Sequence, residues 1–79
     1  LKQAQIFSDY LVRSAGESLK DQVSLALTRV MQRSPTNEEI QQGLDLISNL
    51  QKEDGMSPEQ ARKYFCLVAL NLNEFIYLD

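Results

Sequence analysis

The side chains that could carry chemistry in this chain are few and do not converge. Histidine is absent, which excludes imidazole metal ligands, Ser/His/Asp triads, Cys/His dyads and the C-x-x-C-H motif that attaches haem. Cys66 is the only cysteine, so it forms no intramolecular disulfide and no zinc site, and we interpret it as a buried, inert thiol. Met31 and Met56 are better interpreted as core residues than as axial haem ligands. We therefore expect no cofactor within these residues.

The acidic residues provide neither a general acid and base nor a metal site. Glu38 and Glu39 are sequence neighbours, and neighbours on a helix point about 100° apart. The same holds for Glu53 and Asp54. A calcium loop of the EF-hand type that began at Asn49 would need glycine at its sixth position, where Asp54 stands. The sequence therefore predicts a protein that is not an enzyme.

One serine could carry a covalent cofactor. Gly16-Glu17-Ser18-Leu19 resembles the attachment signature of acyl carrier proteins, in which Asp-Ser-Leu follows a glycine. A phosphopantetheine on Ser18 would place its phosphate at the positive end of a helix dipole. However, Glu17 replaces the aspartate, and the serine falls earlier in the chain than in carrier proteins. An ordinary N-cap is favoured because serine is among the commonest caps, and a small acyl or peptidyl carrier domain is the alternative.

Helices must position these residues, because apolar residues recur at spacings of three and four through most of the chain. A first helix is expected over residues 2–15. Ser18 begins a second over residues 19–33, which Pro35 ends, since proline disfavours a helical residue before it and donates no backbone hydrogen bond. The apolar stripes are Ile6, Phe7, Tyr10 and Leu11 in the first helix, and Leu19, Val23, Ala26, Leu27, Val30 and Met31 in the second.

Two further helices have strong start signals. Thr36 and Glu39 have the spacing of a capping box and begin a helix that ends near Lys52. Ser57-Pro58-Glu59-Gln60 combines a serine cap with proline at the first helical position, and begins a last helix that reaches Asn73 or beyond. The stripes are Ile40, Leu44, Ile47 and Leu50 or Gln51 in the third helix, and Ala61, Tyr64, Phe65, Val68, Ala69 and Leu72 in the fourth.

The predicted fold class is all-α, a single domain over residues 1–79 that forms a compact bundle or an orthogonal array of four short helices. Hydrophobic residues make up 43% of the chain and charged residues 24%, which is ordinary for a folded domain. The net charge of −3 argues against a nucleic-acid partner, and no apolar run approaches the roughly 18 residues that membrane insertion needs. Because the chain begins at Leu1 rather than Met, we expect a piece of a longer protein.

Two motifs resemble a known family. Arg33-Ser34-Pro35-Thr36-Asn37-Glu38-Glu39 is similar to an Arg-x-Pro-Thr-x-x-Glu helix junction, and residues 71–79 are similar to an Asn-x-Asn-Glu-Phe-x-Tyr-x-Asp ending. Both resemble the C-terminal domain of unknown function in the large planctomycete cytochrome c-type multidomain proteins. The resemblance covers about Val23 to Asp79. Gln32 departs from it, since the family pattern usually has glycine before the arginine.

The resemblance implies that the chain is the C-terminal domain of a long, exported or periplasmic protein in which haem-binding modules lie upstream. It implies no catalytic residue, because no activity is established for this segment of the family. We therefore interpret the chain as a non-enzymatic structural or interaction domain. Its partner would be another domain of the same chain or another protein.

The candidate structural or interaction residues come from these two motifs. We expect Arg33 to complement the negative end of the second helix and to reach Glu74 or Asn71 across the bundle. The bulky residues at the chain end are expected to complete the core against the first helix, with an exposed docking patch as the alternative. The candidates are Arg33, Pro35, Thr36, Glu39, Asn71, Asn73, Glu74, Phe75 and Tyr77.

Overall fold

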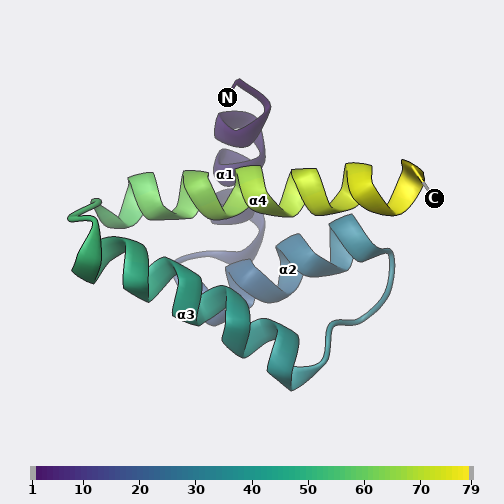
Figure 1. Cartoon of the computed structure of the whole chain (residues 1–79), viewed down its shortest axis with the longest axis horizontal. Helices are drawn as coiled ribbons and strands as arrows, with labels where there is room; N and C mark the ends of the chain where they lie inside the picture. The colour runs from purple at the N-terminus through teal and green to yellow at the C-terminus, as the bar shows by residue number, and fades with distance from the viewer. Residues whose placement is uncertain (1, 79) are drawn as a thin grey trace.

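Across residues 2–78 the computed structural model contains four helices and no strand, and α4 packs against the other three (Figure 1). The structure describes the backbone of residues 2–78 and the side chains of residues 2–71. In Figure 1, α1 crosses behind α4 at a steep angle, whereas α2 and α3 lie below α4, so the arrangement is closer to an orthogonal array than to a parallel bundle. The all-α prediction is confirmed. The helices are α1 (Lys2–Ala15), α2 (Leu19–Met31), α3 (Asn37–Glu53) and α4 (Pro58–Leu78).

The helices α2 and α4 begin where their capping residues predict. Ser18 Oγ accepts a hydrogen bond from the backbone N–H of Asp21 at 3.3 Å. At the start of α4, the Gln60 N–H donates to Ser57 Oγ and the Ser57 N–H donates to Gln60 Oε1, each at 3.1 Å. These bonds satisfy backbone donors that have no partner inside the helix. The local sequence therefore determines both starting points.

The end of α2 differs from the prediction, because the helix stops at Met31 rather than at residue 33. Gln32 adopts the left-handed conformation, with φ of 58°, and its N–H donates to the Thr28 carbonyl at 2.9 Å. This is a C-cap geometry that glycine adopts without steric cost. Gln32 therefore adopts, under strain, a conformation that favours glycine.

The core lies between α4 and the three other helices, and two apolar residues predicted to be in it are not. Ile6 is 59% exposed and Tyr64 is 44% exposed. On α1, the face that is buried carries Ala4, Ser8 and Leu11, so the stripe is rotated away from Ile6. The buried apolar residues among those described are Ala4, Leu11, Val23, Ala26, Leu27, Val30, Ile47, Leu50, Ala61, Phe65, Cys66 and Ala69.

Gly43, in the middle of α3, allows three helices to meet. A Cβ added at this buried glycine would lie 2.7 Å from Val23 Cγ1 of α2 and 3.1 Å from Phe65 Cε1 of α4. The shorter distance is below any ordinary carbon–carbon contact. The sequence pattern of large apolar residues misses this contact, because the essential residue has no side chain.

Candidate functional site

The junction between α2 and α3 brings together Arg33, Pro35, Thr36 and Glu39. The Glu39 N–H donates to Thr36 Oγ1 at 3.1 Å and the Thr36 N–H donates to Glu39 Oε1 at 2.8 Å, so the predicted capping box is present. Arg33 donates to both carboxylate oxygens of Glu39, from Nη1 at 3.0 Å and from Nη2 at 2.8 Å. Arg33 Nη1 also donates to the Ser34 carbonyl at 3.1 Å. The bidentate pair fixes the chain on both sides of Pro35.

Electrostatics at this junction follow from the same bonds. The Arg33 guanidinium, together with the Thr36 backbone N–H, lowers the pKa of Glu39 to about 2 from its ordinary 4.5. The hydrogen bond to Glu39 raises the pKa of Arg33. Solvent screens this pair, because 53% of the Arg33 side chain is exposed. The junction therefore sets the geometry of the turn and contributes modestly to stability.

The predicted reach of Arg33 across the bundle is corrected in part. Among the described residues, its side chain bonds to Glu39 and Ser34 and not to Asn71, which is exposed on α4. The capping box already holds the Glu39 carboxylate six positions away, so Arg33 gains two charge-assisted bonds without crossing the domain. The prediction for Glu74 concerns a side chain outside the described residues. The same holds for the remaining candidates, Asn73, Phe75 and Tyr77.

The two candidate nucleophiles both contribute to the fold. Cys66 is fully buried, and its burial raises the pKa of the thiol to about 11, a shift that the positive charge of Arg62 partly opposes. The thiol is therefore protonated at neutral pH, as an inert structural cysteine should be. Ser18 is exposed at the start of α2, where its Oγ serves as the helix cap.

Two buried polar side chains were missed by sequence reasoning. Ser8 is fully buried on α1 and accepts a hydrogen bond from Arg62 Nε of α4 at 2.7 Å. Gln22 is buried on α2, and its Nε2 donates to the Gly16 carbonyl at 2.6 Å, so it binds the end of α1. The signal for Ser8 was its spacing from Ala4, which places both residues on one face of the helix.

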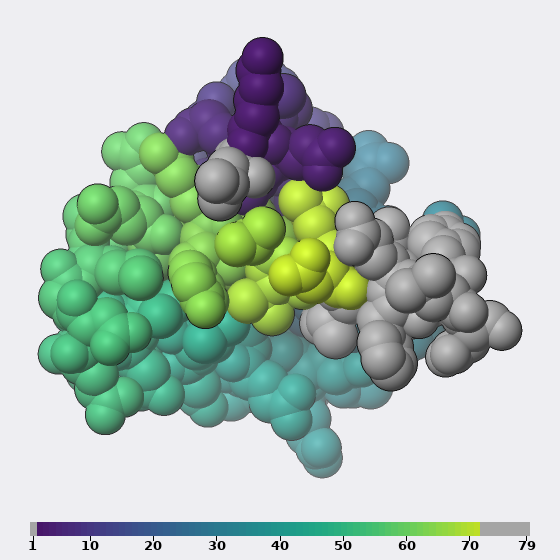
Figure 2. All heavy atoms as spheres, turned by 45° about the horizontal axis from the view of Figure 1, so that its top comes forward, coloured from purple at the N-terminus to yellow at the C-terminus, as the bar shows by residue number. Residues whose placement is uncertain are grey.

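One surface hollow, the α1–α2–α4 hollow, combines apolar and cationic side chains. Its volume is about 610 Å³. The Phe7 and Tyr10 rings stack, with centroids 6.4 Å apart. Arg29 lies 5.3 Å from the centre of the Tyr10 ring and donates to the Tyr10 hydroxyl from Nε at 2.9 Å and from Nη2 at 2.6 Å. Figure 2 shows α1, in purple, lying directly against α4, in green to yellow. The described residues that line this hollow are Gln3, Ile6, Phe7, Tyr10, Arg13, Arg29 and Leu70.

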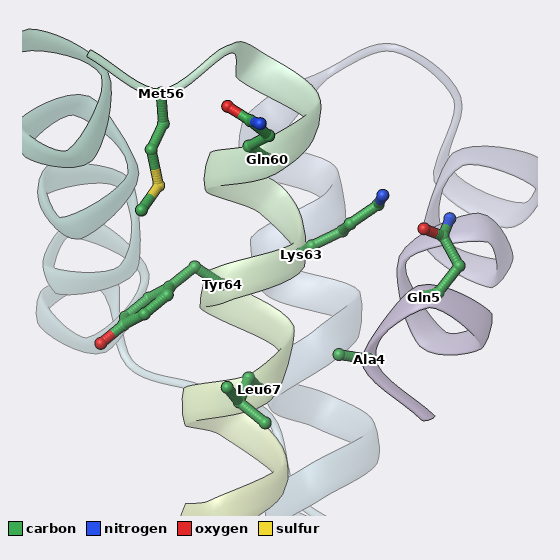
Figure 3. A pocket seen from close by; sticks show the side chains of 7 residues that line it. All are labelled: Ala4, Gln5, Met56, Gln60, Lys63, Tyr64 and Leu67. Atoms are coloured by element: carbon green, nitrogen blue, oxygen red, sulfur yellow. The ribbon is translucent and has the colours of Figure 1, made fainter. Parts of the chain in front are cut away.

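A second hollow, the Tyr64 hollow, lies beside the first half of α4 and has a volume of about 470 Å³. Met56 and Tyr64 lie on one side of α4, and Lys63 extends on the other side toward Gln5 of α1 (Figure 3). Lys63 Nζ is 3.9 Å from a carboxylate oxygen of Glu59, so its charge is partly compensated. The surface of this hollow is therefore mostly apolar and carries little net charge.

Comparisons of the chain with known protein families, with curated proteins and with solved structures find no match. Within the part of the chain that the structure describes, no three potential metal-ligating side chains gather, and no helix combines the length and apolar character that crossing a bilayer requires.

Proposed function

We propose that this chain is a non-enzymatic structural and interaction domain at the C-terminus of a cytochrome c-associated multidomain protein. The observation that carries the proposal is the structural role of the Arg33–Glu39 junction. Its polar groups satisfy one another and the start of α3, so one of the two motifs that resemble the family serves the architecture of the domain. The ending motif supports the same assignment through its resemblance.

The other reactive side chains support this proposal because they also hold the fold together. Cys66 is buried and protonated, Ser8 binds Arg62, and Ser18 caps α2. The side chains that remain outside the core include an exposed isoleucine beside two half-buried aromatic rings. Such a surface is suited to contact with another protein.

The proposed partner is another domain of the same protein, or a second protein that meets it outside the cytoplasm. By resemblance, the upstream domains carry the haem and the protein is exported or periplasmic. The domain itself would contribute a rigid contact surface and no cofactor. We propose neither nucleic acid nor a membrane as its partner, since the charge and hydropathy of the sequence favour a protein.

Isothermal titration calorimetry tests the proposal. The chain would be titrated into the rest of the natural protein, produced without these residues, and we expect saturable binding at one to one. The remainder should also carry a C-x-x-C-H motif and bind haem covalently. Absence of binding, or a remainder without such a motif, would contradict the proposal.

A carrier domain is the second candidate, favoured by one observation: Ser18 is exposed at the N-terminus of a 13-residue helix. Intact mass after incubation with a phosphopantetheinyl transferase and coenzyme A separates the two candidates. We expect no added mass. A stoichiometric adduct that is lost in Ser18→Ala but kept in the matched cap variant Ser57→Ala would overturn the interaction proposal.

A further inference from the structure

The α1–α2–α4 hollow has an exposed apolar residue at its edge. Ile6 is 59% exposed, and the neighbouring Phe7 and Tyr10 rings are only half-buried. A volume of about 610 Å³ can hold one or two large side chains of a partner, since pockets of roughly 300–1,000 Å³ hold ligands of drug size. The hollow is therefore sized for an anchor residue rather than for a whole domain.

Two arginines give this hollow a positive charge. Arg13, from the last turn of α1, and Arg29, from the last turn of α2, both line it and are exposed. Among the described residues, neither guanidinium has a carboxylate partner and no carboxylate lines the hollow. This local charge runs against the net charge of −3 of the chain. A protein partner that complements it must carry acidic groups.

We propose that the α1–α2–α4 hollow is the docking site for an acidic amphipathic helix of a protein partner, a proposal that rests on the proposed function. The helix inserts a leucine-like anchor beside Ile6 and Phe7. Carboxylates three or four positions away then reach Arg13 and Arg29, because residues at that spacing share one helix face. Arg29 is already held by Tyr10, so its guanidinium is ordered before the partner binds.

A synthetic 16-residue helical peptide with one central leucine, and with glutamates three and four positions before and after it, tests this site. We expect the peptide to bind and to shift the backbone NMR signals of α1 and α2. A matched peptide with glutamine for every glutamate should bind about tenfold more weakly, since charge complementarity contributes to the contact. Equal binding of the two peptides, or shifts confined to α3, would overturn the proposal.

Surface variants sharpen the test. Ile6→Ser and Arg13→Gln should each weaken peptide binding about fivefold or more, as truncation of a central contact residue does. The matched controls are Val12→Ser, an exposed apolar residue on α1 outside the lining, and Lys52→Gln on α3, and both should bind like the wild type. Unchanged binding by Ile6→Ser and Arg13→Gln would assign the peptide to another surface.

Other occupants give distinct results. If oligo(dT) at equal concentration displaces the peptide, the stacked rings bind nucleic acid. If the free chain self-associates and Ile6→Ser abolishes this, the hollow binds a second copy of the chain. Either result overturns the proposal. If the rest of the natural protein binds wild type and Ile6→Ser equally, the docking site is wrong and the proposed function stands. If the acidic peptide binds and the rest of the natural protein does not, the proposed function fails alone.

Discussion

Apolar side chains are tightly packed at the Gly43 contact, whereas one of them is largely exposed in the α1–α2–α4 hollow. At Gly43 an added Cβ would lie 2.7 Å from Val23, so three helices meet with no spare room. In the hollow, Ile6 is 59% exposed beside a volume of about 610 Å³. The closed contact fixes how α2, α3 and α4 pack, whereas Ile6 in the hollow is too exposed to contribute much to folding. The difference separates residues that maintain the fold from residues that, under the proposal, contact a partner.

Gly43→Ala should destabilise the protein, because it overpacks the closed contact. We expect a loss of about 1–3 kcal/mol in the free energy of unfolding, reduced by the roughly 1 kcal/mol by which alanine is the better helix former. Denaturant unfolding measures this loss. Val23→Ala should relieve the clash, so the double variant should lose less than the two single variants together. A Gly43→Ala protein as stable as the wild type would contradict the closed contact.

Cys66→Ser tests the same interior from α4. A hydroxyl at this fully buried position must find a hydrogen-bond partner or lose about 1–3 kcal/mol of stability, whereas Cys66→Ala removes only a small apolar group. The thiol should also resist a disulfide reagent in the folded protein at pH 8, since burial raises its pKa to about 11. Labelling as fast as in denaturant would show that Cys66 is accessible.

Gln32→Gly should stabilise the protein by about 1 kcal/mol, because a residue with a Cβ is strained at φ of 58°. The melting temperature measures the gain. Gln32→Ala is the matched control, because it also removes the side chain beyond Cβ but keeps Cβ and therefore the strain. The prediction is wrong if the glycine variant melts below the alanine variant.

Acid should remove the contribution of the Arg33–Glu39 pair. The pKa of Glu39 is lowered to about 2 from 4.5, so the unfolded chain binds more protons between these values. The stability that the pair contributes is fully present above about pH 4.5 and is lost as the pH falls toward 2. The difference in melting temperature between wild type and Glu39→Gln should therefore disappear over that range. Glu38→Gln controls for loss of a charge at the start of α3; a Glu39→Gln difference that persists at low pH would contradict the pairing.

Ile6→Ser should have the smallest effect on stability. We expect a change within about 0.5 kcal/mol, as for other exposed positions, although the variant removes a large apolar side chain. Leu11→Ala on the buried face of the same helix provides the contrast and should cost about 2–5 kcal/mol. Comparable losses for the two variants would show that the hollow belongs to the core.

The sequence predicts the helices well because their boundaries depend on neighbouring residues. The caps at Ser18, Thr36 and Ser57 are local hydrogen bonds, and all three form as their spacing indicates. Gln32 escaped prediction because glutamine rarely adopts the left-handed conformation, so α2 was expected to run two residues further.

The site is less predictable because it depends on how the helices cross. Apolar periodicity indicates a buried face but not its rotation, so the burial of Ser8 was missed and Ile6 was placed inside. Arg33 was expected to make a long-range contact, yet Glu39 was a nearer partner. The pairing of Arg13 and Arg29 around one hollow has no signal in the sequence, since they are 16 positions apart and lie on two helices.

The most direct test of the separation between fold and contact surface uses the double variant Ile6→Ser/Arg13→Gln. Its affinity for the rest of the natural protein is measured by titration, and its stability by denaturant unfolding. The predicted result is at least a tenfold loss of affinity with a free energy of unfolding within about 1 kcal/mol of the wild type. Unchanged affinity, or a loss of stability as large as that of Leu11→Ala, would contradict it.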